Sequence, residues 1–428
     1  MVKELKHTEI GDIPVDWELQ TFDETFRVIS NNTLSRENLN NRGGAVRNIH
    51  YGDILTKFPE VLDCNEEEIP YVNELSLLSS STQLLQDGDI VVADTAEDET
   101  VGKVIEVQNL GDSKLVAGLH TIPCRVKKGD FAPGWLGYYM NSDLFHNQIL
   151  PYITGIKVSS ISKGAISETL ILVPPFDEQE KIVQSLNKIQ LLMTSETKVV
   201  NKIKLVKNGC LSKMFPQKDD TVPEMRLPGF TEAWEQRKLI DYLDVSNEKN
   251  KKGDYKKTDV LSVSGEVGIV NQIEFQGRSF AGVSVENYGI VNEGDVVYTK
   301  SPLKANPYGI IKTNKGKAGI VSTLYAVYKP KENTDSDFVQ IYFELDSRMN
   351  SYMHPLVNKG AKNDMKVSDE NALKGTVTFP KINEQKAISN FITELDHLIT
   401  LHQCKCDKYS NIKKGMMSDL LTGKIRLV

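Results

Sequence analysis

The 428-residue sequence has no run of about 18 apolar residues, and its first segment, MVKELKHTEIGDIPVDW, has no apolar core. A membrane-spanning helix needs the first feature and a secretory signal peptide needs the second. The five cysteines stand at positions 64, 124, 210, 404 and 406, an odd and scattered set that does not fit a disulfide framework. We therefore expect a cytoplasmic protein that works in a reducing compartment.

Motifs for phosphate and metal chemistry are also missing. No G-x-x-x-x-G-K-[ST] phosphate loop and no H-E-x-x-H pattern occur. His397, His402, Cys404 and Cys406 lie close together in the sequence, but positions two apart on a helix point about 200° apart, whereas zinc needs four convergent ligands. We predict no metal site and interpret Cys406 as a small buried side chain.

The charge of the chain is distributed unevenly. Its 51 basic and 58 acidic residues give a net charge of −7. Residues 1–176 alone contain 14 Lys and Arg against 26 Asp and Glu, which is −12. A free-standing nucleic-acid binder normally carries a basic surface, so the charge argues against that class of protein. The length exceeds what one hydrophobic core usually holds, and we expect at least two domains.

A sequence unit recurs at a separation of 206 residues. Glu178-Gln179 returns as Glu384-Gln385, the string DGDIV at 87–91 returns as EGDVV at 293–297, and Gly209 returns as Gly415. Residues 216–230, between the two copies, contain three prolines and mixed charge, as linkers do. The chain is therefore predicted to consist of two copies of one unit.

Each unit changes its hydrophobic period partway. Short segments rich in β-branched residues, such as DIVVAD and DVVYTK, predict strands up to Pro174 and Pro380. Beyond each proline the period becomes helical, and an Asp177 or Asn383 cap followed by Glu-Gln predicts a helix start. The helices should span about 177–215 and 383–421, or roughly 55 Å each.

Both predicted helices carry one long apolar stripe, which we call the seam. A stripe of this length favours a partner helix. The seam residues are Ile182, Leu186, Ile189, Met193, Glu196, Val200 and Ile203 in the first helix, and Ile388, Ile392, Leu395, Ile399, His402, Cys406 and Tyr409 in the second.

We predict an α+β fold in which two β-rich domains are each followed by a long helix, with the two helices packed as an antiparallel coiled coil. The predicted boundaries are 1–175 for the first β-rich domain, 176–215 for its helical region, 216–230 for the linker, 231–380 for the second β-rich domain and 381–428 for its helical region.

The sequence resembles the specificity subunit of type I restriction-modification systems over essentially its whole length. The resemblance is carried by the Trp-Glu pairs at 17–18 and 234–235, the Gly-Asp strands, the two P-x-x-x-E-Q helix starts and the tail LLTGKI at 420–425. It implies two target-recognition domains, each recognising one half of a bipartite double-stranded DNA site, and helices that fix the distance between the halves.

The resemblance also implies partners. Two methyltransferase subunits would dock on the helical regions, and a separate restriction and translocase subunit would be recruited. S-adenosylmethionine, ATP and magnesium are then expected on those partner subunits, with no cofactor in this chain. In agreement, the sequence lacks the F-x-G-x-G loop and the Asn/Asp-Pro-Pro-aromatic motif of adenine methylation, since Asn306-Pro307-Tyr308 has only one proline. We expect a non-catalytic subunit.

Candidate DNA-contacting residues are polar or aromatic side chains in loops of the β-rich domains, the types that reach base edges. In the first domain they are Arg42, Arg47, Tyr51, Thr95, Lys157, Ser159 and Ser160. In the second they are Lys300, Ser301, Lys304, Asn306, Tyr308, Lys359, Lys362, Asn363 and Lys366. The loop after the second-domain strand is basic, whereas its first-domain equivalent at 94–100 is acidic. An ordinary solvated turn is the alternative for each loop.

Two other functions remain open from the sequence. One is a specificity-like subunit of a type IIB restriction-modification enzyme, in which methylase and nuclease share another chain. The other is a coiled-coil scaffold whose two globules bind proteins. Sequence-specific binding of a bipartite duplex by the reconstituted complex would exclude the scaffold.

The repeat predicts the register of the helix pair. Positions 206 apart are exchanged by a pseudo-two-fold axis, so the mid-helix residues Glu196 and His402 should meet across it. A polar pair in an otherwise apolar seam can fix the register at some cost in stability. A solved structure checks this: parallel helices, or an axial separation of these residues above about two turns, roughly 11 Å, would contradict it.

Overall fold

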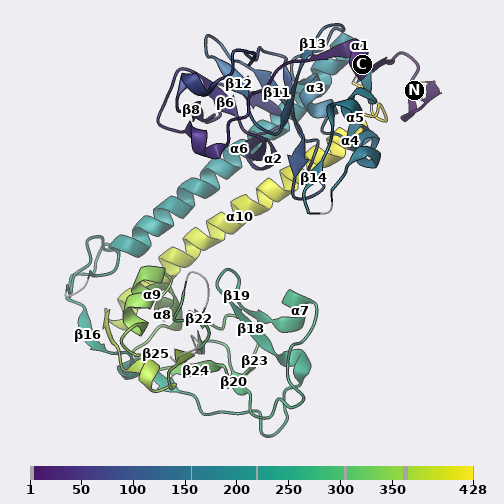
Figure 1. The fold of residues 1–428 in the computed structure, drawn as a ribbon. Helices are drawn as coiled ribbons and strands as arrows, with labels where there is room; N and C mark the ends of the chain where they lie inside the picture. The colour runs from purple at the N-terminus through teal and green to yellow at the C-terminus, as the bar shows by residue number, and fades with distance from the viewer. Residues whose placement is uncertain (1–3, 156, 218–219, 303–305, 360–364, 428) are drawn as a thin grey trace. The chain divides into compact units, whose positions relative to one another are not determined.

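The computed structural model describes residues 4–155, 157–217, 220–302, 306–359 and 365–427, without the side chains of 358–359 and 365–366. The chain forms two compact units (Figure 1). Unit 1 combines Met1–Glu196 with Cys404–Val428, and unit 2 is Thr197–Gln403. Each unit therefore contains one β-rich globule and part of each long helix.

A five-stranded sheet forms the centre of unit 1, in the order β4-β13-β9-β11-β7. Its central strand β9 pairs antiparallel with both neighbours, whereas β7 pairs parallel with β11. The side chains of Ile90, Val91 and Val92 in β9 are all buried, because the sheet is covered on both faces. The strands are β4 (Phe26–Val28), β7 (Val61–Asp63), β9 (Ile90–Ala93), β11 (Val104–Gln108) and β13 (Thr121–Val126).

Smaller sheets complete unit 1. A four-stranded sheet has the order β12-β6-β8-β5, with β5 (Leu39–Asn40), β6 (Arg47–Ile49), β8 (Tyr71–Val72) and β12 (Leu115–Ala117). The two-stranded pairs are β1 (Leu5–Thr8) with β2 (Gly11–Pro14), β3 (Glu18–Thr21) with β15 (Leu170–Val173), and β10 (Thr95–Ala96) with β14 (Ser159–Ser160). The short helices are α1 (Phe22–Thr25), α2 (Tyr51–Thr56), α3 (Trp135–Tyr139), α4 (Asp143–Ile149) and α5 (Lys163–Ser167).

Unit 2 repeats the central part of this plan with a four-stranded sheet in the order β17-β24-β21-β22. Its strands are β17 (Leu243–Val245), β21 (Val296–Thr299), β22 (Ile311–Thr313) and β24 (Tyr325–Pro330). The remaining pairs are β16 (Glu235–Lys238) with β27 (Thr376–Phe379), β18 (Leu261–Ser264) with β19 (Gly268–Asn271), β20 (Gly289–Val291) with β23 (Gly319–Val321), and β25 (Asn358–Lys359) with β26 (Met365–Lys366). The short helices are α7 (Gln272–Gln276), α8 (Ser336–Tyr342) and α9 (Asp346–Met353).

Two long helices, α6 (Phe176–Lys213) and α10 (Ile382–Leu420), follow the β-rich globules. Within unit 1, Gln190 of α6 contacts Lys413 of α10 while the later residue Glu196 contacts the earlier residue Lys405, so the helices run antiparallel. The predicted α+β fold with an antiparallel helix pair is confirmed. The helices begin one residue before the predicted caps Asp177 and Asn383, which therefore lie inside the first turn.

The predicted seam residues are all buried or half-buried. Ile182 and Leu186 join the core of unit 1, and Ile388 and Ile392 join the core of unit 2. Glu196 forms an ion pair of 3.5 Å with Lys405 within unit 1. Glu196 belongs to unit 1, whereas His402 belongs to unit 2. The contact between Glu196 and His402 therefore stays a prediction.

A buried carboxylate at the start of each long helix holds three segments together, which we call the Trp-Glu-Arg cluster. In unit 1, Glu178 accepts hydrogen bonds from the indole of Trp17 at 3.0 Å and from the guanidinium of Arg426 at 2.6 Å. In unit 2, Glu384 accepts from Trp234 at 3.3 Å and from Arg226 at 2.7 Å. Each arginine follows the end of the opposite helix, so the cluster fixes both helix ends on the same globule.

The glutamine after each glutamate is fully buried and bonds only to backbone. Gln179 accepts from the amide of Ala132 and donates to the carbonyl of Pro174. Gln385 accepts from the amide of Asp335 and donates to the carbonyl of Pro380. Because a buried amide side chain must satisfy both its donor and its acceptor, the Glu-Gln repeat has a structural explanation.

In the part of the chain that the structure describes, no helix is both long enough and apolar enough to cross a membrane. All five cysteines are free, and burial raises the pKa of Cys64 to about 11 and that of Cys124 to about 12.

We predict that Glu384→Gln lowers the free energy of unfolding of unit 2 by about 3 kcal/mol, because the Arg226 guanidinium loses its buried carboxylate. Glu232→Gln is the matched control, since Glu232 pairs with Lys381 in solvent. Urea unfolding followed by hydrogen exchange of unit 2 peptides measures both. Equal stability of the two variants would contradict the structural role of the cluster.

Candidate nucleic-acid interface

A group of polar side chains lies at one end of the central sheet of unit 1, and we call it the strand-end cluster: Tyr51, Asp94, Thr95, His120 and Ser160. The Thr95 hydroxyl donates to the Asp94 carboxylate at 2.7 Å and lies 3.2 Å from Nδ1 of His120. Thr95 is also the strand partner of Ser160. The Tyr51 ring lies 5.3 Å from the His120 ring. These residues present hydroxyl, carboxylate and imidazole groups together.

The fold places the cluster because two central strands end there. Asp94 directly follows β9 and His120 directly precedes β13, and the Asp94 amide donates to the His120 carbonyl at 3.1 Å. His120 has a φ of +56°, a left-handed conformation that is uncommon outside glycine. Such backbone strain concentrates at functional positions. The side chains of Asp94 and His120 remain 27% and 45% exposed, so solvent and ligands can reach them.

His50 packs against Tyr51 of the strand-end cluster. It is buried next to Tyr51, with ring centroids 4.7 Å apart, and its Nδ1 accepts from the Gly52 amide. Burial, followed by the nearby Arg36 guanidinium, lowers the pKa of His50, while Asp53 opposes this shift. A neutral His50 can therefore accept the hydrogen bond from the Gly52 amide in the first turn of α2, the helix that begins with Tyr51.

The same sheet end in unit 2 carries a different chemistry. Lys300 directly follows β21, and its amide donates to the Leu324 carbonyl at 3.1 Å, as the Asp94 amide does to His120. The Lys300 ammonium donates to Asp369 at 2.8 Å, and its side chain is 20% exposed. Equivalent backbone positions thus present a carboxylate in unit 1 and an ammonium in unit 2.

The structure brings Tyr51, Thr95 and Ser160 of the sequence candidates together, with Ser159 beside them in β14. Arg42 and Lys157 are exposed residues in loops. Arg47 is different: it is buried in β6, and its guanidinium donates to the Cys64 carbonyl at 2.6 Å. A guanidinium in this position cannot reach a base, so the assignment of Arg47 as a DNA contact is corrected to a structural role.

In unit 2, Ser301 is half-buried beside Lys300, and the Asn306 amide donates to Asp346 at 2.9 Å. Tyr308 is only 8% exposed and packs in the core, with its ring 5.8 Å from that of His354. Its assignment as a loop aromatic that contacts DNA is therefore corrected. Lys304, Lys362 and Asn363 lie outside the described residues, and only the backbone of Lys359 in β25 and of Lys366 in β26 is described.

Sequence reasoning missed His120 and Asp369. Neither stands in a motif: the pairing of β13 with β9 brings His120 beside Asp94, whereas Asp369, in the segment after β26, reaches Lys300 through an ion pair. The available signal was positional: Asp94 directly follows strand β9, and His120 directly precedes strand β13.

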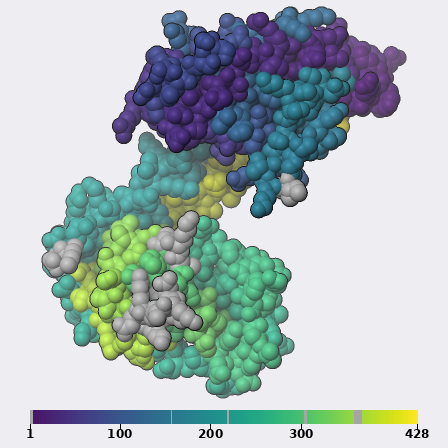
Figure 2. All heavy atoms as spheres, in the orientation of Figure 1, coloured from purple at the N-terminus to yellow at the C-terminus, as the bar shows by residue number. Residues whose placement is uncertain are grey.

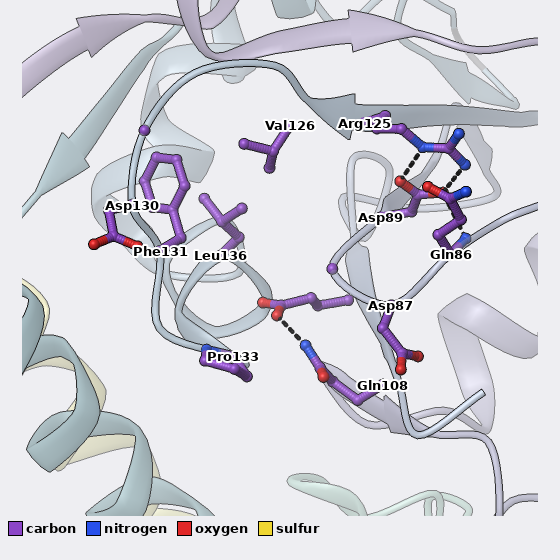
Figure 3. Close-up of a pocket in the computed structure, with 13 residues that line it drawn as sticks. Gln86, Asp87, Asp89, Gln108, Arg125, Val126, Asp130, Phe131, Pro133 and Leu136 are labelled. Carbon is purple, nitrogen blue, oxygen red and sulfur yellow. Dashed lines mark hydrogen bonds and ion pairs between the residues drawn. The ribbon is translucent and has the colours of Figure 1, made fainter. Parts of the chain in front are cut away.

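A cavity of about 440 Å³ lies at the opposite end of the same central sheet in unit 1 (Figure 3). Figure 3 shows Arg125 and Asp89 joined on one side and Phe131, Leu136 and Val126 on the other. The buried carboxylate of Glu106 accepts from the amides of Gly134 and Gly137. Burial raises the pKa of this carboxyl group. The polar groups here bond to one another, and this arrangement explains the attachment of α3 to the sheet.

Comparison with known families assigns the first repeat. Residues 14–205 match the family model for the type I restriction modification DNA specificity domain. The matched span is about as long as the 206-residue separation between the two sequence repeats. A Methanocaldococcus jannaschii protein assigned as the type I restriction enzyme MjaX specificity subunit is 26% identical over 99% of this chain and 96% of that protein. Residues 14–205 thus match a type I specificity domain, and the chain is similar to a specificity subunit over its whole length.

A second M. jannaschii relative of this specificity-subunit family, the type I restriction enzyme MjaVIII specificity subunit, is 22% identical over 64% of this chain and 66% of that protein. The crystal structure of the type I restriction-modification S subunit from M. genitalium has the same fold, with a TM-score of 0.54, 12% identity and coverage of 98% of this chain and 99% of that one. A chain from a structure of type I restriction-modification complex assembly gives a TM-score of 0.52 at 13% identity, covering 96% and 99%.

Proposed function

We propose that the chain is a non-catalytic DNA-specificity subunit that recognises a bipartite DNA target and directs partner methyltransferase and restriction subunits to it. The observation that carries the proposal is the pair of equivalent sheet ends, which combine one backbone geometry with opposite charge. A repeated framework with different polar groups suits the recognition of two different half-sites.

The chemistry of the two sheet ends favours different bases. A carboxylate such as Asp94 can accept a hydrogen bond from the amino group of cytosine, and an ammonium such as Lys300 can donate to O6 and N7 of guanine. Thr95, His120 and Ser160 add donors and acceptors to the first site. Asp369 orients the Lys300 ammonium, which supports directional recognition rather than general attraction to phosphate.

Exposed apolar side chains on the long helices support docking of two copies of one partner. In unit 1, Leu192 and Ile412 are 44% and 39% exposed, and they lie next to Gln190 and Lys413, which contact each other. In unit 2, Leu398 and Val206 are 40% and 48% exposed. The two pairs are related by the 206-residue repeat, and exposed apolar groups of this kind are typical of protein interfaces. We infer that each pair contacts one methyltransferase subunit.

The acidic charge of residues 1–176 fits a role within a complex. An isolated domain at −12 repels the phosphate backbone, so partner subunits must supply most phosphate contacts. We propose that binding by the isolated chain is weak and strongly salt-dependent. S-adenosylmethionine, ATP and magnesium would bind to the partner subunits, not to this chain. The assembled complex would work in the cytoplasm.

The first prediction of this proposal concerns catalysis. The purified chain should transfer no methyl group to DNA and should cut no DNA, because it lacks the cofactor and base-binding motifs of a methyltransferase. Incubation with labelled S-adenosylmethionine and duplex DNA, with and without the partner chain, measures this. Labelled DNA in the absence of the partner would contradict it.

The second prediction concerns modularity. Replacing residues 231–378 with the equivalent region of a relative should change one half-site and preserve the other, because each sheet end belongs to its own unit. Methylation of a panel of duplexes that vary one half-site at a time gives the answer. Altered preference at both half-sites would show that the units do not recognise DNA independently.

A further inference from the structure

Two lysines of the long helices are buried, which is unusual for this residue type. Among the described residues, Lys207 and Lys413 are the only buried lysines, with exposures of 9% and 6%. Lysine is almost never buried unless its ammonium group is paired. The two positions are separated by 206 residues, the separation of the sequence repeat. The framework therefore buries one lysine in each unit at equivalent positions.

In unit 1 the Lys413 ammonium contacts all three parts of the unit. It donates to Gln190 of α6 at 2.8 Å and to the carboxylate of Glu60, which precedes β7 in the globule. It also lies 5.3 Å above the ring of Tyr138 in α3. The hydroxyl of Tyr138 donates in turn to Asn187 of α6 at 2.7 Å. One cation thus joins α10, α6 and the globule.

In unit 2 the Lys207 ammonium makes the same connection. It donates to Asp396 of α10 at 2.7 Å and to Glu344, which follows α8 in the globule, also at 2.7 Å. Burial opposes the charged form, but the carboxylates of Glu344 and Asp396 outweigh it and raise the pKa of Lys207. The lysine is therefore charged when the globule is seated on the helices.

The two sites share their helix positions but not their globule positions. Gln190 and Asp396 are separated by 206 residues, as the lysines are. Glu60 and Glu344 come from different elements of their globules, one before a strand and the other after a helix. The same connection is therefore built from different globule segments, which indicates that joining the globule to the helix pair is the common requirement.

We propose that Lys207 and Lys413 are positioning residues that hold each recognition domain at a fixed orientation on the helix pair. The proposal rests on the proposed function, and it assigns these lysines a role in discriminating between DNA targets with different spacers. A buried ammonium that loses Glu60 or Glu344 is left incompletely paired, so tilting of the globule is opposed. Without the lysine, the globule can tilt and accept half-sites at other separations.

The test uses the complex of the full chain with its methyltransferase partner. Duplexes carry the two half-sites with the native spacer, or with a spacer one base pair shorter or longer. The wild-type complex should strongly prefer the native spacer. Lys413→Met and Lys207→Met should reduce that preference at least tenfold while duplexes with an altered half-site are still rejected. Lys413→Arg, which keeps the charge, should restore most of the preference.

Matched controls separate positioning from general damage. Lys414→Met and Lys204→Met change exposed lysines on the same helices and should retain the wild-type spacer preference. Glu60→Gln and Glu344→Gln leave both helices intact and break only the contact to one globule, so they serve if a lysine variant fails to assemble. A purely structural role would reduce methylation at all spacers in parallel.

An unchanged ratio of rates between spacers in assembled Lys413→Met, or in assembled Glu60→Gln, would overturn the positioning role. Failure of the proposed function gives a different result: the wild-type complex would then methylate duplexes without requiring two half-sites. The two failures are therefore distinguishable from the wild-type control alone.

Discussion

The structure depends on a buried carboxylate at the start of each long helix. Glu178 and Glu384 have almost no exposure. Each accepts hydrogen bonds from a tryptophan directly before a strand, β3 or β16, and from an arginine beyond the end of the other helix. A carboxylate in this environment requires both partners, since removing one leaves a buried charge uncompensated. The beginning of one helix and the end of the other are thereby held on the same globule in each unit. In Figure 2, yellow residues of the C-terminal segment emerge at the purple and blue surface of unit 1.

The residues of the two units fall into two kinds, those that recur in both units and those that differ between them. The tryptophan, glutamate, glutamine and lysine of the helix junction recur in both units with the same partners or the same kind of partner. The residues at the sheet ends do not recur, since Asp94 and Lys300 occupy equivalent backbone positions with opposite charge. A protein that recognises two different half-sites from one scaffold is expected to keep the first set and to vary the second. Lys207 and Lys413 belong to the first set, although their globule partners differ.

The sequence predicted the two units, the helices to within about two residues and their antiparallel packing, because those features follow from local periodicity and from a constant offset of 206 residues. It did not predict Arg226 and Arg426, which are separated by 200 residues and therefore escape a search at the repeat offset. It placed Arg47 and Tyr308 at the DNA surface because residue type alone does not reveal burial, and the structure shows one bonded to the Cys64 carbonyl and the other packed in a core. His120 and Asp369 were missed because contacts between distant segments decide their positions: the pairing of β13 with β9 for His120, and the ion pair with Lys300 for Asp369.

We propose that the two units recognise separate halves of one DNA target. Methylome sequencing of a host that carries this gene together with its methyltransferase partner tests it most directly. If the two units recognise separate halves, the methylome should contain one methylated motif made of two specified segments, separated by an unspecified spacer of constant length. A single uninterrupted motif, or methylation without any sequence preference in the presence of the assembled complex, would contradict it.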